Sequence, residues 1–182
     1  MFNPQLNSKT AEIIGKELER KIFIYSKDTT FVRALRGIHS PNIIDKIDNF
    51  RINKDKRYSE CIAALHTRDF TDFVNKYIES YSFDFRTITI VSYAEALGNS
   101  IMHGSNYGRN GSVYSTWMIF GQAALIYIDD PGKGFGPGMK PKDHNANRGK
   151  GLNYMNNYSS FDYGIEKTRY GFRTILLYKR KK

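Results

Sequence analysis

The sequence has little of what extracellular and membrane proteins are built from. It contains one cysteine, Cys61, in 182 residues, so no disulfide can form within the chain. No N-terminal stretch combines a basic start, an apolar run and a small-residue cleavage site. The longest apolar run, 117–128, is interrupted by Gly121 and Gln122 and falls short of the roughly 20 residues that a membrane-spanning helix needs. We therefore expect a reduced, cytoplasmic protein with no membrane segment.

The usual signs of nucleic-acid recognition are also missing, although the formal net charge is +10. Apart from the terminal KRKK, the basic residues are scattered, and no recognition-helix, zinc or single-strand-binding pattern accompanies them. A solvated basic surface that favours acidic partners explains the charge. We expect no specific nucleic acid as a partner, and basic nucleic-acid binding is the weakest alternative function.

The chain does contain enough apolar material for a core, since 40% of its residues are apolar and 14% aromatic. From 29 to 58 the pattern is mixed, with a break at Ser40-Pro41 because the residue before a proline avoids helical geometry. The order of elements predicts one α+β domain, 1–182, a two-layer sandwich of a mixed, mostly antiparallel sheet with helices on one face. The predicted strands are 21–26, 113–120, 123–129 and a closing antiparallel pair, 161–168 and 172–180; the predicted helices are 31–38, 69–81, 85–102 and 152–159.

A polar row runs along the predicted helix 85–102. Glu95, Asn99 and His103 follow one another at steps of four, so on a helix they form one slanted ridge. Such a ridge must meet water, a partner or a ligand. Gly104 is expected to end the helix, and His103 to cap carbonyl groups near that end. The other faces are filled by Val91, Ala94, Leu97, Gly98 and Ile101.

Three segments follow in order: EALGNSIMHG (95–104) on this helix, IDDPGKGFGP (128–137) at a strand end, and NRGKGLNYM (147–155) where a helix starts. Each alone is most simply a solvated helix face, a tight turn or a loop. Together they resemble the histidine-kinase-type ATP-binding fold shared by gyrase, heat-shock chaperone, histidine-kinase and mismatch-repair ATPases. The first segment is most similar to the Glu-Ala-x-x-Asn-Ala-x-x-His-Gly helix of the anti-sigma-factor serine kinases.

The resemblance covers about 85–179 and implies an ATP-binding core over 67–182, with 1–66 as an N-terminal strand plus an elaboration of uncertain role. It also implies that the polar ridge is the floor of a nucleotide site. Asn99 offers an amide oxygen, a hard ligand suited to Mg²⁺, which keeps several waters and binds few protein groups. Glu95, one turn earlier, would point to the same cavity, and it is the candidate catalytic base.

The family pattern Asp-x-Gly-x-Gly falls on Asp130, Gly132 and Gly134. By resemblance Asp130 receives the adenine amino group, and an ionised carboxylate suits this task because it only accepts hydrogen bonds. The two glycines would let the backbone come close to the base. Asp129 is the competing carboxylate, but on a strand it would point to the opposite face.

The RGKGL segment would bind the phosphates. Its two glycines precede a helix whose free N–H groups and positive dipole end favour anions, and its two cations add charge. The family's Gly-Thr pair at the start of the last strand is replaced here by GFRT, which delays the threonine. The candidate nucleotide-binding residues of this end are Arg148, Gly149, Lys150, Gly151, Leu152 and Thr174.

By resemblance the leading function is a serine/threonine protein kinase of the anti-sigma type that uses ATP and Mg²⁺. Its partners would be a small anti-anti-sigma-like regulatory domain, which it phosphorylates, and a sigma factor, and it would be a candidate homodimer. The alternative is a non-catalytic, ATP-gated binding module that sequesters a sigma factor or other regulator. An intact Glu95 favours the kinase over the module.

Overall fold

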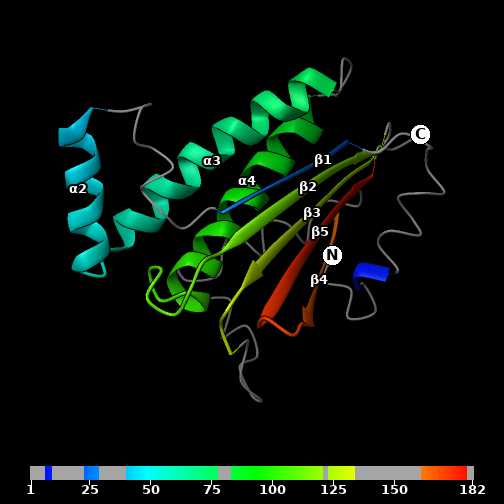
Figure 1. The fold of residues 1–182 in the computed structure, drawn as a ribbon. Helices are drawn as coiled ribbons and strands as arrows, with labels where there is room; N and C mark the ends of the chain where they lie inside the picture. Colours follow the sequence, from blue (N-terminus) through cyan, green and yellow to red (C-terminus); the bar gives the residue numbers. More distant parts are fainter. Residues whose placement is uncertain are drawn as a thin grey trace, which may run out of the picture.

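The computed structural model of the protein describes residues 7–9, 23–28, 40–77, 83–120, 123–133 and 161–179 (Figure 1). These residues form an α+β fold, as predicted. The elements are β1 Phe23–Asp28, α2 Pro41–Ile52, α3 Lys56–Tyr77, α4 Phe83–Asn99, a π-helical turn η2 Ser100–Gly104, β2 Tyr114–Phe120, β3 Ala123–Asp130, β4 Phe161–Lys167 and β5 Phe172–Lys179.

The five strands form one sheet in the order β1-β2-β3-β5-β4. All four pairings among these strands are antiparallel, so the described sheet is not the mixed one that was predicted. The pairs β2–β3 and β4–β5 are consecutive in the chain, and short connections favour antiparallel neighbours. The predicted strand pairs are otherwise confirmed, and β3 extends one residue further, to Asp130.

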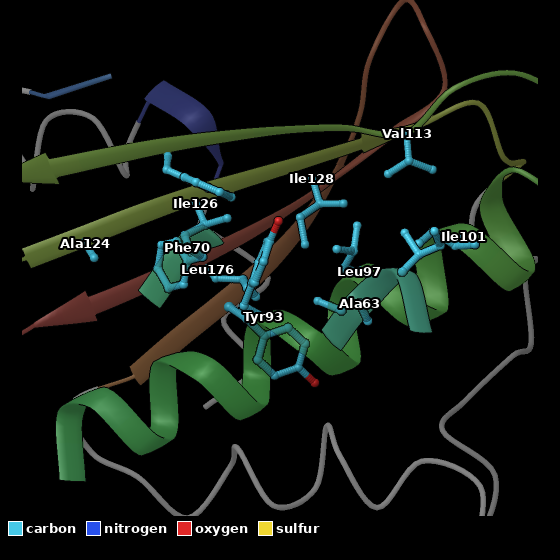
Figure 2. Packing of buried hydrophobic residues seen from close by; sticks show 14 of the residues in the cluster. Ala63, Phe70, Tyr93, Leu97, Ile101, Val113, Ala124, Ile126, Ile128 and Leu176 are labelled. Carbon is cyan, nitrogen blue, oxygen red and sulfur yellow. The ribbon is translucent and has the colours of Figure 1, made fainter. Parts of the chain in front are cut away.

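Helices α3 and α4 pack together on one face of the sheet, called here the helix face (Figure 1). Alternation along β3 directs Ala124, Ile126 and Ile128 to this face, where they meet Tyr93 and Leu97 of α4 (Figure 2). Each of these five residues is buried. The centre of the layer is aromatic, because the ring of Trp117 lies 5.1 Å from that of Phe70 and 5.8 Å from that of Tyr93.

The opposite face of the sheet, called here the second face, has its own buried cluster. The segment 7–9 is attached there through Ser8, whose carbonyl accepts a hydrogen bond from the Tyr127 hydroxyl at 3.2 Å. The Ser8 hydroxyl also accepts a bond from Arg173 at 3.0 Å. The cluster consists of Met118, Ala123, Leu125, Tyr127, Ile175 and Leu177.

Two helices differ from the sequence-based expectation. Ser40 is extended, with φ −62° and ψ 148°, as predicted for a residue before proline, but Pro41 then begins α2, which was not predicted. Proline is tolerated in the first helical turn because that turn needs no N–H donor. Helix α3 begins at Lys56 rather than at Asp69. The predicted helices 31–38 and 152–159 lie outside the described residues.

Parts of the predicted N-terminal elaboration join the same structure as the predicted core. Strand β1 pairs with β2, and α3 runs continuously through residues 66 and 67. Helix α2 packs on α3. At the end of α2, the Ile52 carbonyl accepts a hydrogen bond of 2.9 Å from the Arg109 guanidinium. In the part of the chain that the structure describes, no helix is both long and apolar enough to cross a membrane.

Candidate functional site

The polar ridge lies on the accessible side of α4 and η2. Glu95 and His103 are exposed and Asn99 is half-buried, whereas Leu97 and Ile101 are fully buried. Val91, which was expected to fill one of the other faces of the helix, lies four residues before Glu95 and therefore continues the ridge, with 37% of its surface exposed. Over residues 90–104, the buried side of α4 and η2 consists of Ser92, Tyr93, Ala96, Leu97, Ser100, Ile101 and Gly104.

The helix changes its winding directly after Asn99. The Ser105 N–H donates to the Ser100 carbonyl five residues earlier, at 2.8 Å, which makes η2 a π-helical turn. Such turns widen a helix locally and are frequent at functional sites. Here the wide turn places Ser100 and Gly104 against the end of β3, where Asp130 lies.

Asp130 is a buried carboxylate at the junction of the first two motifs. It is 8% exposed, and its Oδ1 accepts a hydrogen bond from the Gly132 N–H at 2.9 Å. The Ser100 side chain also hydrogen-bonds to it. Burial raises the pKa of Asp130, against the lowering effect of these two bonds. As the pH falls, this carboxyl therefore takes up its proton at a higher pH than an exposed aspartate does.

Three glycines let the backbone close around Asp130. A Cβ on Gly104 would overlap Cγ and Oδ1 of Asp130, and one on Gly132 would lie 2.7 Å from Oδ1. A Cβ on Gly171, at the entry to β5, would overlap the Asp130 carbonyl oxygen and lie 2.8 Å from Cα of Pro131. Glycine is needed at these positions for close approach.

Thr174 lies on the same side of the sheet as Asp130. The register pairs Asp130 with Phe172 and Ile128 with Thr174, so Thr174 is the diagonal neighbour of Asp130 on β5. Diagonal neighbours are about 7–8 Å apart, within reach of one shared ligand. The structure thus brings Thr174 to the carboxylate end of the candidate site.

Asp129 belongs to the other side of the sheet, as the strand alternation predicted. Its two carboxylate oxygens accept hydrogen bonds from Arg173 Nε at 2.6 Å and Nη2 at 3.0 Å. This ion pair gives Asp129 a structural partner on the second face. It is therefore not a rival of Asp130 for a ligand on the helix face.

The described residues contain only part of the candidate site. Glu95 and Asn99 share α4 with a separation of one turn, and Asp130, Gly132 and Thr174 meet at the ends of β3 and β5. Among the described residues, no group of three or more His, Cys, Asp or Glu could hold a metal ion. The predicted residues Gly134, Arg148, Gly149, Lys150, Gly151 and Leu152 lie outside the described ranges.

Two of the hollows lined by described residues include neither Asn99 nor Asp130 in their lining. One of about 430 Å³ separates α2 from α3, with Ile47, Phe50 and Cys61 among its lining residues. The other, of about 400 Å³, lies on the second face beside Asp129 and Arg173. The candidate nucleotide site is thus defined by its motifs and by Asp130, and these hollows are separate from it.

Two contributors to the candidate site were missed by sequence reasoning. Ser100 follows Asn99 directly, and its small hydroxyl in an apolar stretch was the available signal. Gly171 directly precedes β5 as the first residue of the GFRT segment, and a glycine at the entry to a strand was its available signal. Neither the known protein-family models nor the curated proteins provide a match to the chain.

Proposed function

We propose that the protein binds Mg²⁺·ATP on the helix face of the sheet and transfers its terminal phosphoryl group to a serine or threonine of a small regulatory domain. The observation that supports this proposal best is the environment of Asp130. Segments 95–104, 128–137 and the start of β5 are far apart in the sequence, yet Ser100, Gly104 and Gly132 pack around this one carboxylate, and Gly171 lies against the backbone carbonyl of the same residue.

A buried carboxylate with a small accessible fraction suits the recognition of a purine amino group. Its lone pairs are acceptors only, and Gly132 and Ser100 already fix its orientation. An adenine presents a donor at its amino group, whereas guanine presents an acceptor at the corresponding position. The site would therefore favour ATP over GTP, with Thr174 as an additional hydroxyl beside the base.

The remaining roles come from the resemblance to the anti-sigma-factor serine kinases. Asn99 would hold Mg²⁺ together with waters and ATP phosphates, which is how this ion usually binds in phosphoryl-transfer sites. Glu95 would take the proton from the acceptor hydroxyl. The RGKGL residues would bind the phosphates. A sigma factor as second partner and a homodimer belong to the same proposal.

The second candidate function, an ATP-gated binding module without phosphate transfer, is favoured by one observation. Glu95 is exposed on α4, whereas an effective base works in a site from which water is largely excluded. Titration of the full chain with a fluorescent ATP analogue, with and without Mg²⁺, tests what the two candidates share. Failure to bind at millimolar nucleotide would reject both.

Replacing Asn99 with alanine should remove most of the Mg²⁺-dependent gain in ATP affinity, about tenfold, because the amide oxygen is lost. The fold should persist, since Asn99 is half-buried at the end of α4 and alanine is a better helix former. Nucleotide titration beside circular dichroism measures both. His103→Ala, on the same ridge, is the control, and an equal Mg²⁺ effect in the two variants would contradict the metal role.

Asp130→Asn should reduce the preference for ATP over GTP by about tenfold, because the amide presents a donor where adenine needs an acceptor. Asp129→Asn is a matched control: it makes the same chemical change one residue away, on the second face. Competition of ATP and GTP for a fluorescent nucleotide gives the readout. An unchanged preference in Asp130→Asn would make this aspartate a turn residue only.

A further inference from the structure

The second face has a polar hollow of about 400 Å³ that the nucleotide proposal does not use. It lies over the ends of β2, β3 and β5 and beside the connection between β4 and β5. Its volume falls in the range of about 300–1,000 Å³ that is typical of small-molecule sites. Its lining residues are Tyr114, Thr116, Asp129, Thr168, Arg169, Tyr170 and Arg173.

The floor of this hollow is a fixed ion-pair network. Arg173 on β5 donates two hydrogen bonds to Asp129 on β3. Its Nη1 also lies 3.7 Å from Oε1 of Glu166 on β4. Its guanidinium also stacks on the Tyr127 ring at 4.5 Å. Glu166 in turn accepts hydrogen bonds from the N–H and the hydroxyl of Ser8. Because these charges already have partners, the floor has little free charge to offer a ligand.

The walls of the hollow are aromatic and held in place. Tyr114 is 41% exposed and Tyr170 is 45% exposed, and their rings lie 5.9 Å apart in an edge-to-face arrangement. The Tyr170 hydroxyl donates to the Ser112 carbonyl at 2.7 Å. The β4–β5 connection is closed by a bond from the Thr168 N–H to the Gly171 carbonyl at 2.9 Å. Two large rings are thus presented to solvent without being free to fold away.

Arg169 supplies the one cation at this hollow that no described residue pairs with. It is exposed at the tip of the β4–β5 connection, next to Tyr170. A guanidinium offers donors in a planar fork that matches carboxylate and phosphate oxygens. The overall charge of +10 further favours an anionic ligand.

We propose that this hollow binds a small ligand made of a flat ring and one anionic group, a carboxylate or a phosphate. The ring would lie against Tyr114 and Tyr170, and the anion would meet Arg169. The site is distinct from the proposed nucleotide site because Asp129 and Arg173 face the side of the sheet opposite to Asp130.

The test uses the full chain labelled with ¹⁵N and ¹³C and titrated with phenyl phosphate, benzoate, inorganic phosphate and benzyl alcohol. Phenyl phosphate and benzoate should bind with dissociation constants of about a millimolar. Shifts should appear at the Arg169 side chain and at the rings of Tyr114 and Tyr170. Inorganic phosphate and benzyl alcohol should bind at least about fivefold more weakly, since each uses only one half of the site.

Arg169→Gln should weaken phenyl phosphate about tenfold, since a charged hydrogen bond is lost. Arg68→Gln, at an exposed arginine of α3, makes the same change away from the hollow and should leave binding unchanged. Tyr114→Leu should remove the advantage of phenyl phosphate over inorganic phosphate. The proposal is overturned if no aromatic anion binds, if Arg169→Gln binds as tightly as the native chain, or if the shifts cluster at Asn99 and Asp130 instead.

Discussion

Replacing Glu95 with glutamine is expected to lower phosphate transfer by about 10²–10⁴-fold, the usual contribution of a positioned general base. Nucleotide binding should change little, because the amide keeps the size of the side chain. Transfer should fall, because the amide cannot accept a proton at neutral pH. Glu95 is exposed on α4, so the substitution leaves the buried side of the helix intact. A loss of transfer would therefore not reflect a loss of folding.

The experiment compares native protein and Glu95→Gln with labelled ATP and candidate small regulatory domains from the same genome. Glu60→Gln is a matched control, because Glu60 is an exposed glutamate on α3 that lines the hollow between α2 and α3. Equal transfer by Glu95→Gln would remove Glu95 from the mechanism. Native protein that binds Mg²⁺·ATP yet phosphorylates no such domain would favour the ATP-gated module.

The strands could be predicted well because their signal is local. Runs of β-branched, aromatic and other apolar residues mark β2, β3 and β5, alternation of such residues with polar ones and glycine marks β4, and the strand ends fall within a residue or two of the expectation. The helical region before residue 69 could not be predicted in the same way. Tyr58 and Ile62 are buried one turn apart, but Lys56, Arg57 and Glu60 stand among them in the sequence and hide the stripe. Both belong to the core cluster that includes Ile44 and Ile47 of α2, and the Tyr58 ring lies 6.3 Å from that of Tyr107, so their burial depends on tertiary contacts.

Parts of the candidate site could be predicted where the regular geometry of a strand fixes the side to which a residue points. Alternation along β3 was sufficient to separate Asp129 from Asp130, and the structure places their side chains on opposite faces. The partners of Asp130 were harder to find. Ser100 reaches it from the widened turn η2, and Gly171 lies beside its backbone at the start of a strand that is far away in the sequence. Contacts between distant segments leave no local pattern.

The same closeness makes Gly104 the most sensitive glycine of the site. An alanine methyl group there would overlap Cγ and Oδ1 of Asp130 and lie 2.7 Å from its Cβ. The Asp130 carboxylate is held by the hydrogen bond from the Gly132 N–H, and the Asp130 backbone carbonyl lies against Gly171, so this residue has little room to move away. Gly98 provides a contrast within the same helical segment, because a methyl group there would meet no atom within 4 Å.

Gly104→Ala is therefore expected to lower the free energy of unfolding by about 1–3 kcal/mol, the usual cost of overpacking a tight site. It should also weaken ATP about tenfold or more, because the clash displaces the carboxylate proposed to bind adenine. Gly98→Ala should instead raise the free energy of unfolding by up to about 1 kcal/mol, since alanine favours the helical conformation. Urea unfolding and nucleotide titration of both variants measure these effects.

A double substitution distinguishes the clash from a general weakening of the helix end. Asp130→Gly removes all three atoms that the new methyl group would approach most closely, so Gly104→Ala should cost much less stability in that background than in the native chain. If the cost is the same in both backgrounds, Gly104 is required for the η2 turn itself and not for the approach of Asp130. If Gly104→Ala destabilises the fold yet leaves ATP affinity unchanged, the carboxylate is part of the packing alone, and adenine recognition by Asp130 is refuted.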